Sequence, residues 1–155
     1  MPAPLRLWIH TAFNPAFACG GWAYVLAEPG LTAGAVGGER TASPDRVALA
    51  GLAEALKAAR AGVAVSVASA DPRILAIARR IPTLEADPPP GDLDLWAPLA
   101  AALKGRAVTF ATEEARPRTP AAFALAWSEL ARDKSKASGV FRAVIPRTNL
   151  AKAGI

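Results

Sequence analysis

The chain has 155 residues, of which 52% are hydrophobic and 20% are charged, and its formal net charge is +5. This composition excludes a disordered chain, and the length is sufficient for one domain with a sizeable core. No apolar run reaches the ~18 residues that a membrane span requires, and we expect no secretory signal in the first ten residues. The single cysteine, Cys19, excludes an internal disulfide, so we expect a protein of the reducing cytoplasm.

Three strands are predicted at the start of the chain, over residues 5–13, 20–30 and 31–42. The first strand is rich in apolar and aromatic residues and ends at an Asn-Pro pair. The second lies between a Gly-Gly pair and a Pro-Gly pair, and the third is weakened by glycines. The short turns between them predict an antiparallel meander.

The clearest helix is predicted over residues 43–62. Ser43 is a suitable N-cap, Pro44 occupies the first helical position, and Gly62 terminates the pattern. Apolar residues recur near helical spacing between these signals. The apolar strand predicted over 63–69 follows this helix, which implies a parallel crossover connection.

The rest of the chain alternates helices with one more strand. The predicted elements are a helix over 71–81, a proline-rich connector over 82–92, a helix over 93–105, a strand over 106–112 and a helix over 119–136. The whole order predicts an α/β fold. Its sheet is mixed and five-stranded, with three antiparallel strands followed by two parallel ones, and helices flank it.

The last segment, residues 137–155, shows no clear periodicity. We therefore divide the chain into a folded domain over 1–136 and a basic C-terminal tail over 137–155. The tail could be a flexible arm that contacts phosphates, or a strand and a helix that dock on a partner. Its apolar residues favour docking.

Basic residues are concentrated in the last third of the chain. Residues 104–155 carry 10 Lys and Arg against 4 Asp and Glu, whereas residues 1–103 carry 8 against 9. A cationic region of this kind fits a polyanionic ligand, but it equally fits a solvated surface that keeps the protein soluble.

Five short segments occur in a particular order and spacing. They are "GGWAYVL" in the second strand, "RVALAGLAEAL" in the first helix, the strand "VAVSVAS", the helical "DLDLWAPLAAAL" and "SELAR" in the last helix. Together they resemble the ribonuclease H family over roughly residues 5–133. The resemblance implies a ribonuclease H-like fold, and members of that family hydrolyse the RNA strand of an RNA–DNA hybrid.

In that family, four carboxylates hold two Mg²⁺ ions that activate water and stabilise the leaving oxygen. The resemblance places the four positions on His10, Ala48, Ala68 and Ser128, none of which is a carboxylate. The mobile histidine of the family also has no counterpart, because residues 104–128 contain no histidine. We therefore expect a vacated metal site, with no catalytic residue, no bound metal, no cofactor and no nuclease activity.

Three interpretations of His10 stay open. It could be a core or rim histidine that a backbone carbonyl satisfies, or it could contact a phosphate at the former metal site. It could also be a transition-metal ligand, although one histidine without neighbouring ligands is not a metal site.

Two further groups of residues are candidates for chemistry. Cys19 with His10 as its base is the one enzyme-like alternative, although no third orienting residue is evident and a buried, inert cysteine is the simpler interpretation. Among the four tryptophans, Trp96 or Trp127 could stack on a base if it is exposed.

Five basic residues are the candidate nucleic-acid contacts: Arg116, Arg118, Arg132, Lys134 and Lys136. The resemblance places the first two in a loop that borders the substrate cleft, and the others end the last helix, where the helix dipole also favours cations. We expect a catalytically inactive ribonuclease H-like protein that binds an RNA–DNA hybrid or another nucleic acid through this C-terminal face. The alternative is a structural or adaptor module that binds a protein partner through an apolar edge or the tail and has no nucleic-acid role.

Overall fold

Six strands form one mixed sheet in the computed structural model, which describes residues 3–40 and 42–155. The strands lie in the order β5-β4-β1-β2-β3-β6. Their bounds are β1 (Leu5–Asn14), β2 (Cys19–Glu28), β3 (Leu31–Glu39), β4 (Val65–Ser69), β5 (Val108–Thr112) and β6 (Phe141–Val144). The helices are α1 (Pro44–Ala58), α2 (Pro72–Arg80), the short 3-10 helix η1 (Ile81–Thr83), α3 (Leu93–Leu103), α4 (Pro120–Ser138) and α5 (Arg147–Leu150).

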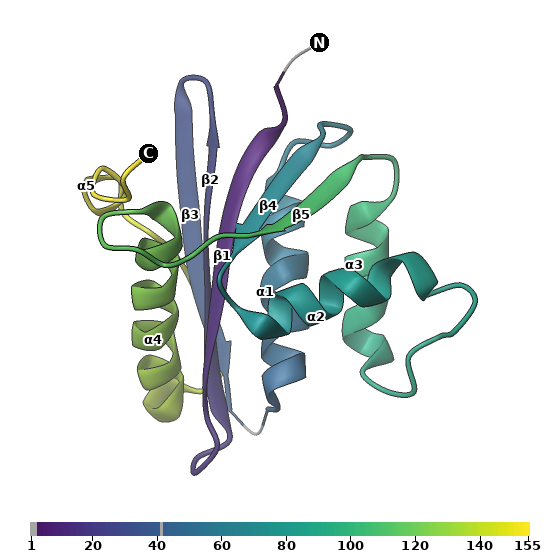
Figure 1. Cartoon of the computed structure of the whole chain (residues 1–155). Helices are drawn as coiled ribbons and strands as arrows, with labels where there is room; N and C mark the ends of the chain where they lie inside the picture. Colours follow the sequence, from purple (N-terminus) through teal and green to yellow (C-terminus); the bar gives the residue numbers. More distant parts are fainter. Residues whose placement is uncertain (1–2, 41) are drawn as a thin grey trace.

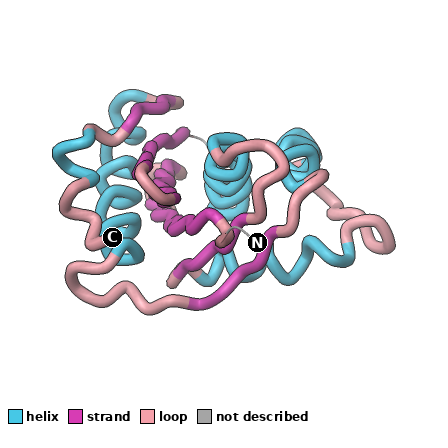
Figure 2. Tube along the Cα trace, turned by 90° about the horizontal axis from the view of Figure 1, so that it is seen from above, coloured by secondary structure: helices cyan, strands magenta, loops and turns pink. Residues whose placement is uncertain are grey.

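The pairing of the strands agrees with the predicted α/β fold. β1 pairs with β2 and β2 with β3 in antiparallel register, whereas β4 lies parallel to both β1 and β5. Figure 1 shows α4 on one face of this sheet and α1, α2 and α3 on the other. The view from above in Figure 2 separates the same two layers of helices.

The prediction of five strands is wrong, because the segment assigned to the tail contributes a sixth. β6 pairs antiparallel with β3, with Phe141 opposite Gly38 and Val144 opposite Ala35. The residue that follows β6 in the chain, Ile145, is buried against the sheet. A four-residue strand is too short for alternation to be visible in the sequence. The boundary placed after residue 136 falls inside α4, which continues to Ser138.

The face of the sheet under α1 carries the larger core. The helix begins where predicted, because the side chain of Ser43 accepts a hydrogen bond from the backbone N–H of Arg46 at 3.2 Å. Leu49, Leu52 and Leu56 are all at most 1% exposed between this helix and the sheet. Full burial of each such side chain stabilises the fold by about 1.5–3 kcal/mol.

The opposite face is covered by α4, which packs on β1, β2 and β3. Its close approach depends on Gly21, since a Cβ atom there would lie 2.2 Å from the backbone nitrogen of Arg132. Gly21 therefore determines how near this helix can lie, whereas a Cβ on Gly20 would meet Val47 of α1 instead. Within the described residues, no helix combines the length and the hydropathy needed to cross a bilayer.

Candidate functional site

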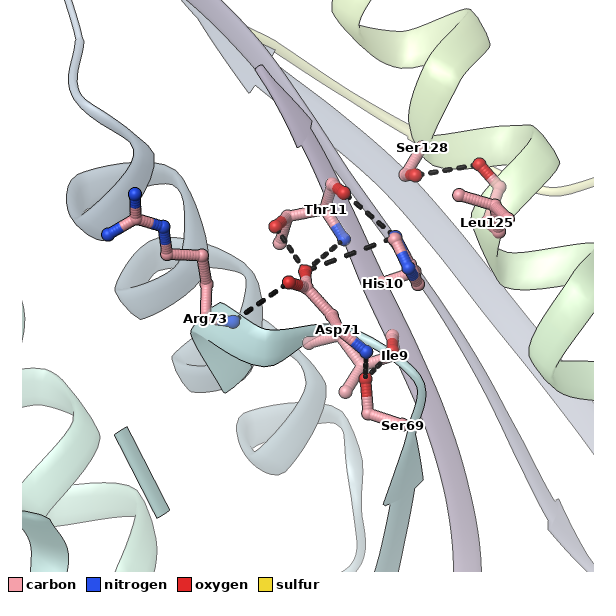
Figure 3. A network of polar contacts seen from close by, with 8 residues as sticks. All are labelled: Ile9, His10, Thr11, Ser69, Asp71, Arg73, Leu125 and Ser128. Atoms are coloured by element: carbon pink, nitrogen blue, oxygen red, sulfur yellow. Dashed lines mark hydrogen bonds and ion pairs between the residues drawn. The ribbon is translucent and has the colours of Figure 1, made fainter. Parts of the chain in front are cut away.

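The turn from β4 into α2 carries the buried carboxylate Asp71, which is 4% exposed. Asp71 is the N-cap of α2, and its Oδ1 accepts a hydrogen bond from the backbone N–H of Arg73 at 2.9 Å. Its Oδ2 accepts the backbone N–H of Thr11 at 2.8 Å and also the Thr11 hydroxyl. Figure 3 shows this carboxylate between β1 and the start of α2.

Ser69 fastens the same turn to β1. Its hydroxyl donates to the carbonyl oxygen of Ile9 at 2.6 Å and accepts the backbone N–H of Asp71 at 3.0 Å. The two side chains thus cross-link the end of β4 to the middle of β1. Both oxygens of the Asp71 carboxylate are already used as acceptors within the fold.

His10 lies beside this network on β1. Its Nδ1–H donates to the carbonyl oxygen of Thr11 at 2.8 Å, and Nδ1 is 3.9 Å from Oδ2 of Asp71. The side chain is 14% exposed. This contact is the one expected under the first interpretation, in which a backbone carbonyl satisfies the histidine.

The structure brings only part of the expected metal positions together. Ala68 packs beside Trp8 on the face of the sheet that α4 covers. Ser128, on α4, is fully buried, and its hydroxyl donates to the carbonyl oxygen of Leu125 at 2.7 Å. Ala48 lies on α1 and is buried in the core on the other face of the sheet. The sheet therefore separates Ala48 from the positions that face α4.

The donor set around His10 does not fit a two-magnesium centre. Mg²⁺ prefers several oxygen ligands, and Asp71, whose oxygens already accept three hydrogen bonds, is the carboxylate beside His10. Nearby acidic side chains are also engaged: Glu113 accepts the indole N–H of Trp8 at 2.7 Å, and Glu114 pairs with Arg116. In the part of the chain that the structure describes, no three His, Cys, Asp or Glu side chains form a group able to hold a metal ion.

The geometry does not support Cys19 as a nucleophile with His10 as its base. In the β1–β2 register, His10 lies opposite Ala23 and Cys19 lies opposite Asn14, a separation of four residues along the strands. This corresponds to about 13 Å. The Cys19 thiol is fully buried and contacts the carbonyl oxygen of Arg132 at 3.7 Å.

Neither tryptophan singled out as a stacking platform is fully exposed. Trp127 is half-buried and packs against Phe123, with ring centroids 5.9 Å apart. Trp96 is half-buried in α3 and lines a cleft of about 370 Å³ between α1, α2 and α3. Trp127 is therefore partly covered by Phe123, whereas Trp96 borders an open cleft.

An ion-pair cluster beside this cleft ties α3 to α1. Arg46 donates to Asp92 at 3.0 Å and to both carboxylate oxygens of Asp94 at 3.0 and 2.8 Å. Hydrogen bonding to Arg46 holds the pKa of the Asp94 carboxyl below its usual value. The shift belongs to an exposed structural pair and lies outside the expected metal site.

The five candidate basic residues form two groups rather than one. Arg116 and Arg118 are exposed in the loop before α4, whereas the other three occupy its last two turns. A helix of 19 residues is about 28 Å long, so the groups lie at opposite ends of α4. Arg116 pairs with Glu114 at 2.9 Å.

The group at the C-terminal end of α4 contains two cations that lie over aromatic rings. Lys134 Nζ is 4.8 Å from the ring centroid of Phe141, and Lys136 Nζ is 3.8 Å from that of Phe17. Arg132 pairs with Asp133 at 3.0 Å. Phe17 was not predicted as a functional residue from the sequence, where the one signal is an aromatic residue between two alanines in a hairpin turn.

Comparison with known proteins gives a structural likeness and no match in sequence. No family model matches the chain, and no curated protein matches it. Among solved structures, it is similar to the N-terminal RNase H domain of Rv2228c from Mycobacterium tuberculosis, solved as a fusion with maltose-binding protein. The TM-score is 0.64 at 17% identity, over 86% of this chain and 96% of that one. The chain therefore has a ribonuclease H-like fold, as the resemblance in sequence predicted.

Proposed function

We propose that this protein binds nucleic acid without cleaving it, through the basic residues at the two ends of α4. The observation that carries the proposal is the donor set around His10. One imidazole lies beside one carboxylate, and the oxygens of that carboxylate are committed to Thr11 and to the N-terminus of α2. This arrangement supports a structural role for His10 and Asp71 in place of metal binding.

Electrostatics supports binding in the absence of cleavage. Four carboxylates without metal ions would repel a phosphate backbone, and His10, Ala48, Ala68 and Ser128 remove that repulsion. The exposed cations at the ends of α4 supply attraction that does not depend on base sequence. An RNA–DNA hybrid is the first ligand to test because of the fold.

The test is a titration of the protein against labelled RNA–DNA hybrid, duplex DNA and single strands, with Mg²⁺ present and at several salt concentrations. Each sample is also run on a denaturing gel. We expect binding without cleavage, with log K falling against log salt by about 0.9 for each phosphate contact on a duplex. Cleavage, or no binding at low salt, would overturn the proposal.

A second candidate function is a module that binds a protein partner, and the exposed apolar residues around β6 favour it. Val140 is 81% and Val144 is 70% exposed, at an edge of the sheet. Apolar side chains at a sheet edge fit a protein surface better than a phosphate backbone. The test is sedimentation of the parent and of Val144→Lys, with the exposed Leu93→Lys on α3 as control. Self-association that only Val144→Lys removes would support this role, and a monomeric parent that also binds nucleic acid would count against it.

A further inference from the structure

Phe17 is a large apolar side chain that the fold leaves in water. It lies in the turn between β1 and β2 and is 52% exposed. Most phenylalanines of folded domains are more deeply buried, because an exposed ring loses the free energy of transfer from water. Phe17 therefore needs an explanation other than core packing.

The turn that presents Phe17 is held in place by hydrogen bonds. The side chain of Asn14 accepts the backbone N–H of Ala16 at 3.0 Å, and the carbonyl oxygen of Ala18 accepts the backbone N–H of Ala42 at 2.9 Å. Ala18 adopts a left-handed conformation with φ of 49°, which few residues other than glycine occupy at low cost. The ring is thus displayed by a defined turn.

One cation lies directly over this ring, and two more occupy the same end of α4. The β1–β2 turn and the C-terminal end of α4 lie at the same end of the molecule (Figure 1), and Lys136 lies over the Phe17 ring. Lys134 and Arg132 are on the same two helical turns, and Asp133, which pairs with Arg132, is the acidic residue among them. An exposed aromatic face bordered by cations is the combination that binds single-stranded nucleic acid.

We propose that this end of the molecule binds single-stranded nucleic acid, with one base stacked on Phe17 and the adjacent phosphates held by Lys134 and Lys136. The inference rests on the proposed function and names the ligand class that this group of cations takes. A base within a duplex is already stacked on its neighbours and cannot reach the ring, whereas an unpaired base can. The side chain is 52% exposed even with Lys136 over it, so in this proposal the base stacks on the part of the ring that Lys136 does not cover.

The experiment measures fluorescence anisotropy of a labelled single strand, a duplex of equal length and a strand of equal length that lacks bases. The parent is compared with Phe17→Ala, with Phe17→Trp and with Leu31→Ala. Leu31 is a matched control, because it is 45% exposed at the β2–β3 turn, at the other end of the same strands. Circular dichroism of each variant confirms that it is folded.

We expect Phe17→Ala to weaken binding of the single strand about tenfold, while Phe17→Trp and Leu31→Ala keep parental affinity or better. Affinity for the duplex and for the strand without bases should change less than about twofold, because phosphate contacts carry it. Equal binding of the single strand by Phe17→Ala and the parent would overturn this inference and leave the proposed function standing. A parent that binds none of the three probes would overturn both.

Discussion

The turn from β4 into α2 and the C-terminal end of α4 are both rich in polar side chains, and these side chains differ in what they contact. At the turn, Asp71 accepts three hydrogen bonds and Ser69 makes two, all within the protein. At the end of α4, Lys134 and Lys136 are exposed and each lies over an aromatic ring at the surface.

The difference separates residues that hold the fold from residues that are available to a ligand. A buried acceptor whose partners are all backbone or hydroxyl groups cannot exchange them for a ligand without loss of stability. An exposed ammonium group can change partners at little cost. Substitutions should therefore affect stability in the first region and binding in the second.

The largest expected effect is a loss of stability in Asp71→Ala. The change leaves the N–H groups of Thr11 and Arg73 without their acceptor and removes the N-cap of α2, so we expect a loss of about 3 kcal/mol. Urea denaturation followed by circular dichroism measures it. Asp71→Asn retains a capping oxygen and should lose less; a loss below about 1 kcal/mol in Asp71→Ala would mean that the turn is not held by this carboxylate.

The next effect is on binding, in a variant that combines Lys134→Glu and Lys136→Glu. Both ammonium groups are exposed, so affinity for nucleic acid at low salt should fall by about tenfold or more, similarly for all sequences, with the salt slope reduced by about two. The same reversal at Arg116 and Arg118 tests the other end of α4. The control is Arg79→Glu, because Arg79 is exposed on α2, on the other side of the sheet. Parental affinity in both double variants would refute the hypothesis that these basic residues bind nucleic acid.

A smaller effect is expected at His10, which lies beside the Asp71 network but is partly exposed. Its Nδ1–H is used by the carbonyl oxygen of Thr11, so His10→Gln should keep affinity for nucleic acid within about twofold at both neutral and mildly acidic pH. Anisotropy titrations of the parent and the variant give the comparison. If the parent gains affinity on acidification and His10→Gln does not, the histidine contacts phosphate, as in the second interpretation.

The smallest effect concerns Asp94, whose ion pair with Arg46 is exposed. The pKa of Asp94 is lower in the folded protein than in the unfolded chain, where it is about 3.9. The ion pair therefore contributes its full stabilisation at pH values above that unfolded pKa. This contribution is lost as the pH falls through the lower pKa of the folded state. Arg46→Gln should return the pKa of Asp94 to its usual range, as NMR titration of the carboxyl carbon can detect. Arg73→Gln, which removes the partner of Asp45 instead, should leave Asp94 unchanged.

Local patterns in the sequence predicted the fold well. The Ser-Pro pair at residues 43 and 44 and the Asp-Pro pair at 71 and 72 start helices, because capping depends on neighbours along the chain. β6 was not predicted, since a strand of four residues at the sheet edge owes its place to pairing with β3.

The candidate site was harder to predict, because its contacts depend on strand register. A helix was predicted to begin at residue 71, but the position of Asp71 beside His10 follows from the parallel pairing of β1 with β4, which places Trp8 next to Ala68. The separation of Ala48 from His10 likewise depends on tertiary structure, because Ala48 lies on α1, which packs on the opposite face of the sheet from α4. The exposure of Phe17 depends on the conformation of a turn, for which neighbouring alanines carry little signal.

The pairing of β6 with β3 also affects how the protein behaves in concentrated solution. β3 spans nine residues, three of them glycines, and one edge of it would otherwise present unpaired N–H and C=O groups over its whole length. β6 covers residues 35–38 of that edge and presents a strand of only four residues that includes Arg142, and short, charged edges resist the strand-to-strand aggregation that leads to fibrils. A chain that stopped before Phe141 would lose this protection and should aggregate more readily, even if the rest of its sheet formed correctly.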